Sequence, residues 1–143
     1  MARGKKTKSF SARFSAEVVD RLDSHSSRLS QSKARVAERM IDEGLRMEQF
    51  PGIMFRTGPT GRRAGVVGGP DVWEIMRDVK GASAEGADDP MSAVSTVTGL
   101  DRSKVELAVR YYGAYPDEVD ERIRMNAQAA ELLQRALGQT PAA

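Results

Sequence analysis

The chain of 143 residues contains no cysteine and a single histidine. A disulfide-stapled scaffold and a thiolate zinc site are therefore excluded, and we expect no metal site and no cofactor. No apolar run approaches the ~20 residues that a membrane-spanning helix needs. The opening "MARGKKTK" is followed by no apolar segment, so we expect no secretory signal. These absences predict a cytoplasmic protein of one or two small domains, without membrane contact.

Charge is present but unevenly distributed. Residues 1–46 contain eleven Lys/Arg and six Asp/Glu, a net charge of +5, whereas residues 47–143 carry a net charge of −3. The first thirteen residues contain basic side chains and no acidic one. A basic N-terminal module joined to a mildly acidic one indicates a polyanion partner for the first; a merely solvated basic arm is the alternative.

The stretch "KSFSARF", residues 8–14, alternates apolar and polar side chains as a β-strand does. One side of this strand carries Phe10, Ala12 and Phe14, and the other carries Ser9, Ser11 and Arg13. At Ser15, a favourable N-cap, the pattern changes to a helix that we expect to reach about Leu29. A second helix is expected to be capped by Ser32 and to run to about Met47.

A lone strand of seven residues leaves its backbone groups without partners, so we expect it to pair with the same strand of a second copy. Such a two-stranded ribbon fits the major groove of DNA, where Ser9, Ser11 and Arg13 would read base edges. The start of the second helix, Ser32 and Lys33, would bind phosphate, as would Lys5, Lys6 and Lys8 near the N-terminus. The predicted dimer core consists of Phe10, Ala12, Phe14, Val18, Leu22, Val36 and Met40.

Residues 8–46, "SFSARFSAEVVDRLDSHSSRLSQSKARVAERMIDEGL" and its flanks, resemble the ribbon-helix-helix DNA-binding proteins of the Arc, MetJ and CopG type. The resemblance lies in the alternating strand, the Ser-capped helix and the "SQSK" entry to the second helix. It implies a homodimer, or a higher oligomer, on an inverted-repeat operator. Ser30 stands where such proteins usually have glycine, in the turn between the helices.

Beyond a basic arm at 1–7 and this module at 8–48, we expect a β-hairpin and a short helix over residues 49–80. The hairpin strands are "GIMFR" and "AGVV", joined by the loop "TGPTGRR", and Asp71 caps the helix. The small, acidic stretch "GASAEGADDP" at 81–90 is the predicted linker. Helices follow over 91–137, with Gly99-Leu100 in a turn and Pro116 opening the last helix, and a tail occupies 138–143.

Residues 50–126, with "GIMFRTGPTGRRAGVV" and "YYGAYPDE", resemble a bacterial antitoxin-associated family. That resemblance implies a partner of the PIN-like ribonuclease toxin class. The candidate partner-binding residues are Arg62, Arg63, Trp73, Tyr112 and Tyr115. Arg62 and Arg63 could equally form a solvated hairpin tip, and Trp73 could belong to the core. The helical pair around Gly99 also has helix-turn-helix spacing, but its near-neutral charge favours protein recognition over a second DNA site.

No pair of carboxylates, nucleophile or phosphate-binding loop meets the requirements of a catalytic site, so we expect no enzyme and no catalytic residues. We expect a mainly α fold with a short intermolecular β-ribbon: an N-terminal ribbon-helix-helix dimer, then a β-hairpin and a helical domain of helix-turn-helix type. The predicted function is a nucleoid-associated transcriptional repressor that is the antitoxin of a type II toxin-antitoxin system. The alternative is a ribbon-helix-helix regulator of phage, plasmid or bacterial origin without a toxin.

Overall fold

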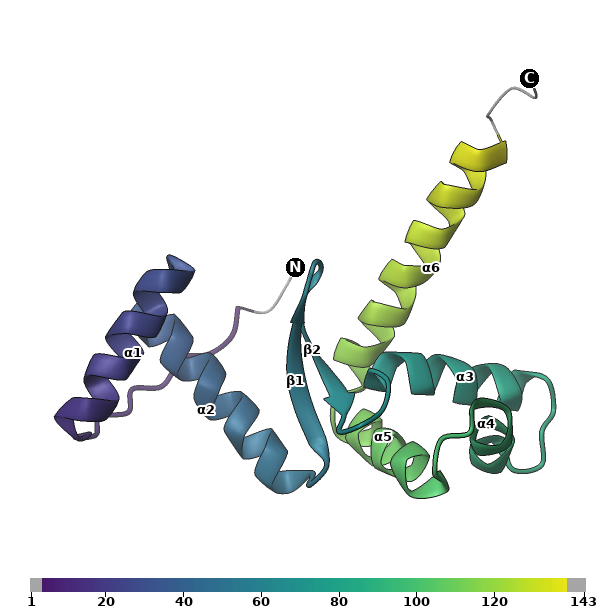
Figure 1. Ribbon diagram of the computed structural model, residues 1–143, viewed down its shortest axis with the longest axis horizontal. Helices are drawn as coiled ribbons and strands as arrows, with labels where there is room; N and C mark the ends of the chain where they lie inside the picture. Colours follow the sequence, from purple (N-terminus) through teal and green to yellow (C-terminus); the bar gives the residue numbers. More distant parts are fainter. Residues whose placement is uncertain (1–3, 139–143) are drawn as a thin grey trace. The chain divides into compact units, whose positions relative to one another are not determined.

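The computed structural model of the chain describes residues 4–138 (Figure 1). This part of the chain is mainly helical, with six helices and one two-stranded antiparallel sheet. It divides into two compact units, and the division falls between Gly44 and Leu45. Residues 1–3 of the predicted arm and 139–143 of the predicted tail lie outside the described residues.

The first unit contains two helices that begin where local chemistry predicts. Helix α1 (Ala16–Leu29) is capped by Ser15, whose hydroxyl oxygen accepts a hydrogen bond from the backbone N–H of Val18 at 3.3 Å. Helix α2 (Lys33–Gln49) is capped by Ser32, which accepts from the N–H of Arg35 at 3.2 Å, and α2 runs two residues beyond the predicted end. Ser30 adopts the left-handed conformation, with φ 52° and ψ 39°, that glycine usually supplies in such turns.

The second unit begins at Leu45, near the end of α2, and continues with a hairpin. Strand β1 (Ile53–Gly58) pairs with β2 (Gly61–Val66), with Ile53 opposite Val66 and Gly58 opposite Gly61. The two-residue turn is much shorter than the predicted loop at 57–63. That prediction was wrong because the glycines and Arg62 pair across the hairpin instead of forming a loop.

Three helices follow the hairpin: α3 (Val72–Ala84), α4 (Pro90–Thr98) and α5 (Arg102–Ala114). Asp71 caps α3 as predicted, and its backbone N–H donates to Glu74 at 3.0 Å. The linker predicted at 81–90 is wrong in extent. Its small residues extend α3 to Ala84, and α3 packs against α4 within one unit, so the linker separates no domains.

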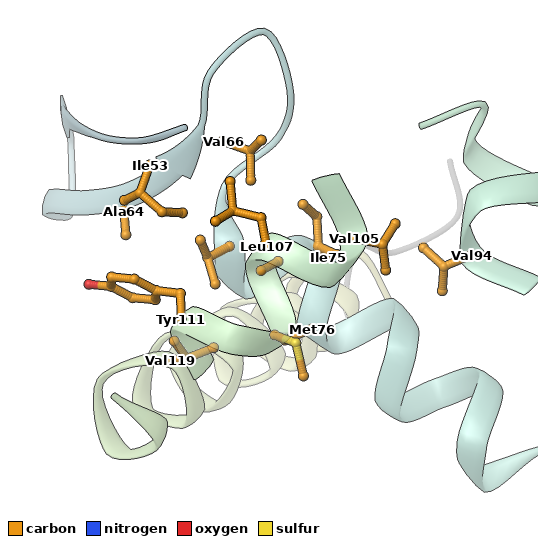
Figure 2. Close-up of a cluster of buried hydrophobic side chains, with 12 residues drawn as sticks. Ile53, Ala64, Val66, Ile75, Met76, Val94, Val105, Leu107, Tyr111 and Val119 are labelled. Atoms are coloured by element: carbon orange, nitrogen blue, oxygen red, sulfur yellow. The ribbon is translucent and has the colours of Figure 1, made fainter. Parts of the chain in front are cut away.

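The core of the second unit lies where the hairpin, α3 and α5 meet (Figure 2). Tyr111 and Val105 of α5 are fully buried there, and Val66 of β2 and Ile75 of α3 are nearly so. Val94 brings α4 to the same cluster, and Val119 brings α6. The two short strands thus gain a packed face that a free hairpin would lack.

Helix α6 (Pro116–Gly138) is the longest element, and Pro116 occupies its first position as predicted. Its first turns pack on α3 and α5, and the rest of the helix continues beyond them (Figure 1). Gly138, assigned to the predicted tail, is the last residue of this helix. Within residues 4–138, no helix combines the length and the apolar character that would let it cross a membrane.

Candidate nucleic-acid interface and partner surface

The predicted base-reading residues lie on a segment that has no regular secondary structure in the single chain. Residues 4–15 form neither helix nor strand, and Ser9, Ser11 and Arg13 are all exposed. The three predicted phosphate-binding lysines, Lys5, Lys6 and Lys8, are exposed on the same segment. The segment is therefore accessible to a partner, and its pairing with a second copy stays a prediction.

The predicted phosphate site at the start of α2 has the required polar groups, and each of them has a partner within the chain. The Ser32 oxygen accepts from the backbone of Arg35, which leaves the hydroxyl proton available as a donor. The Lys33 ammonium lies 2.7 Å from a carboxylate oxygen of Asp23 on α1, and both side chains are about half exposed. Exposed ion pairs contribute at most about 1 kcal/mol, so Lys33 can turn toward a phosphate at small cost.

Only one of the seven predicted dimer-core residues is buried within the described part of the single chain. Val36 is fully buried and Leu22 is half-buried. Phe10 is 83% exposed and Phe14 is 60% exposed. The remaining exposed members of the predicted core are Ala12, Val18 and Met40. Over residues 4–44, Val36 is the sole buried apolar side chain, so this unit buries very little apolar surface within the single chain.

Three of the five candidate partner-binding residues meet at one groove of the second unit. Arg62, Arg63 and Trp73 line a hollow of about 260 Å³ where β2, the start of α3 and the first half of α6 come together. Arg122 of α6 borders the same groove and donates to the carbonyl oxygens of Thr60 and Arg62, each at 2.9 Å. The other lining residues are Thr60, Ala64, Val72, Glu118, Val119, Glu121 and Met125.

Arg63 has a structural role at the floor of this groove. Its guanidinium pairs with the buried carboxylate of Asp71, which also pairs with Arg56 at 3.0 Å. Arg56 donates further to the carbonyl oxygens of Val66 and Gly69, each at 2.8 Å. One carboxylate thus joins both hairpin strands to the start of α3, and Arg63 is not a solvated tip.

Tyr112 and Tyr115 lie outside the groove lining, in two separate clusters. The Tyr112 hydroxyl donates to Asp120 of α6 at 3.2 Å, and Lys80 of α3 lies 2.6 Å from the same carboxylate. Hydrogen bonding to Lys80 lowers the pKa of Asp120, and the same bond raises the pKa of Lys80. The ring of Tyr115 lies under the guanidinium of Arg46, 3.9 Å from its centroid.

The sequence patterns did not indicate the polar cluster formed by Arg46, Tyr111 and Glu118. Arg46 donates to the Tyr111 oxygen at 2.9 Å and to Glu118 at 3.0 Å. These residues are 65 and 72 positions from Arg46, and helical periodicity gives no information on such contacts. The cluster fixes the last turn of α2 to α5 and α6 inside the second unit.

Residues 4–138 contain no group of three or more His, Asp or Glu side chains that could hold a metal ion. Compared with known proteins, the chain matches no family model, no curated protein and no solved structure.

Proposed function

We propose that this protein is a sequence-specific DNA-binding repressor that acts as a ribbon-helix-helix homodimer. The observation that carries the proposal is the incomplete core of the first unit. Val36 is its sole buried apolar side chain over residues 4–44, while Phe10 and Phe14 project from an unpaired segment directly before α1. A second copy of the same segment would provide hydrogen-bond partners for the unpaired backbone. It would also bury the exposed phenylalanine side chains.

A ribbon of two such segments would have one apolar and one polar face. Phe10, Ala12 and Phe14 would cover the four helices of the dimer, and Ser9, Ser11 and Arg13 would face outward twice. Two-fold symmetry then requires an inverted-repeat operator. The N-terminus of each α2, with Ser32 and Lys33, would contact phosphates on either side of the ribbon.

Binding to DNA selected from random duplexes tests this proposal. Arg13→Ala should weaken binding to the selected site by about 1–3 kcal/mol and relax its sequence preference, because a base contact is lost. Lys33→Ala should weaken binding to all DNA sequences alike. It should also reduce the slope of log binding constant against log salt concentration by about one per protomer. Arg124→Ala, which alters an exposed pair on α6, is the matched control and should bind as the parent does. Parent-like binding by both test variants, or a monomer in light scattering at micromolar concentration, would refute the ribbon dimer.

We further propose that the second unit neutralises a PIN-like ribonuclease toxin and that the protein autoregulates its operon. The groove supports this second role because it combines Trp73 with three arginines, residue types enriched at protein interfaces. Co-expression with the neighbouring gene product, followed by purification, tests it. A complex that Trp73→Ala weakens at least tenfold supports the proposal. If no complex forms, the function that remains is that of a DNA-binding regulator without a toxin partner.

A further inference from the structure

The second half of α6 extends past the packed body of the second unit (Figure 1). All residues from 124 to 138, here called the overhang, are exposed. Fifteen helical residues span about 22 Å. The overhang carries large apolar side chains that solvent surrounds: Leu132 is 65% exposed, Leu133 60% and Leu137 67%.

One apolar stripe of α6 runs from the core into the overhang. Val119 is buried and Ile123 packs against the core. The same face continues through one polar residue, Asn126, and then through Ala130, Leu133 and Leu137, at alternating steps of four and three residues. This is the seam spacing of a two-helix coiled coil. The overhang therefore offers the same kind of face that the first turns of α6 already bury within the chain.

The charge of the overhang indicates what covers this seam. Between residues 124 and 138, the charged side chains are Arg124, Glu131 and Arg135, which fall on the side away from the seam. Glu131 and Arg135 lie 3.9 Å apart on the same helix. Ala127, Ala129 and Gln134, which flank the seam, are small or uncharged. Because this face is uncharged, it gains nothing from an oppositely charged partner, and two copies of it do not repel each other.

We propose that the overhang pairs with the overhang of a second copy, in antiparallel orientation. Antiparallel pairing sets Ala130 against the partner's Leu133, so that a small side chain faces a large one in both directions. Parallel pairing would set Ala130 against the partner's Ala130 and leave a gap. Antiparallel helices also have opposed dipoles, and each body lies at its own end of the pair. This contact is separate from the proposed ribbon and does not depend on it.

Cross-linking of the full chain tests the pairing and its direction, since the protein has no cysteine of its own. In the antiparallel pair, residue 126 is level with the partner's residue 137. A mixture of Asn126→Cys and Leu137→Cys should therefore form a disulfide-linked dimer on mild oxidation. Each variant alone should not, because its two cysteines are about 16 Å apart along the helix, beyond disulfide reach. A mixture of Gln128→Cys, on the solvent side, with Leu137→Cys is the control and should not cross-link.

No cross-link in the mixture overturns the proposal, and equal cross-linking by each single variant overturns the antiparallel direction. A second measurement needs no cysteine. The proposed ribbon is first removed by Phe10→Glu and Phe14→Glu, so that the overhang is the one proposed contact left between copies. In that background, Leu133→Glu combined with Leu137→Glu should convert a dimer to a monomer in sedimentation, at unchanged helix content. An unchanged mass overturns the pairing.

Discussion

The guanidinium of Arg46 donates a hydrogen bond to the phenolic oxygen of Tyr111 at 2.9 Å, within the core of the second unit. Tyr111 is fully buried, and its own hydroxyl proton is donated to Glu118 at 2.8 Å. The hydroxyl therefore has one donor and one acceptor as partners. Burial, followed by the hydrogen bond to Glu118, raises the pKa of Tyr111 well above its usual value of 10.

The raised pKa predicts loss of stability in alkali. Because the folded protein favours the neutral phenol, this stabilisation is complete below pH 10 and decreases as the pH rises above the unfolded pKa. The urea midpoint of the parent should fall between pH 10 and 11 more steeply than that of Tyr111→Phe. If Tyr111 stays neutral in the folded state, only the other tyrosines ionise. The absorbance of ionised tyrosine at pH 11 should then be the same in the folded parent and in folded Tyr111→Phe. A larger signal in the parent would show that Tyr111 ionises in the folded state.

Removal of the Asp71 carboxylate should destabilise the second unit strongly. Asp71 is 5% exposed and pairs with Arg56 and Arg63, whose side chains are about a quarter exposed. Asp71→Asn leaves both guanidinium groups without their carboxylate, and we expect a loss of about 3 kcal/mol, the lower end for a broken buried pair. Urea denaturation followed by circular dichroism measures the loss.

Asp78→Asn is the matched control for that substitution. Asp78 also pairs with an arginine, Arg77 at 2.9 Å, but both side chains are more than a third exposed. The expected change is within about 0.5 kcal/mol. If the two variants unfolded at the same urea concentration, the cluster around Asp71 would not hold the hairpin to α3.

Element boundaries were predictable wherever one residue determines them. Ser15, Ser32 and Asp71 cap their helices, and Pro116 opens α6, because a side chain or ring acts on the backbone next to it. The end of α3 was not predictable in this way. Residues 81–84 are small, but the helix continues through them to Ala84, and α3 packs on α4.

The candidate site was predictable only in part, for a related reason. Arg62, Arg63 and Trp73 were selected by residue type, and the fold brings them to one groove. The pairing of Arg63 with Asp71 depends on the hairpin register, which residue type does not encode. Residues 8–14 show the opposite limit: their alternation predicts a strand, whose proposed partner is a second chain.

The start of α4 should stay intact to a lower pH than a cap with the usual aspartate pKa would allow. The backbone N–H of Ser92 donates to Asp89 at 3.1 Å, and Arg102 of α5 donates to it at 2.7 Å. These bonds lower the pKa of Asp89 to about 2, and the bond from the Ser92 backbone has the largest effect. The stabilisation is present above the unfolded pKa near 4 and is lost as the pH falls through 2.

The amide resonance of Ser92 reports this titration in nuclear magnetic resonance spectra. We expect its midpoint near pH 2 in the parent and at higher pH in Arg102→Ala, though still below 3.8, since the Ser92 bond remains. Lys104→Ala, on the same helix but bonded to the carbonyl of Gly68, is the control and should leave the midpoint unchanged. A midpoint of 3.8 in the parent would mean that Asp89 does not cap α4.

Replacing Ser30 with glycine should stabilise the protein. Its left-handed backbone, φ 52° and ψ 39°, costs a residue with a Cβ about 1–2 kcal/mol, of which the greater chain entropy of glycine offsets about half. Ser30→Gly should therefore raise the free energy of unfolding by about 0.5–1 kcal/mol, measured by urea denaturation at fixed protein concentration. Ser24→Gly in the exposed middle of α1 should lower it by about 0.5 kcal/mol, because glycine there only weakens the helix. If both substitutions were destabilising, the turn between α1 and α2 would not require the left-handed conformation.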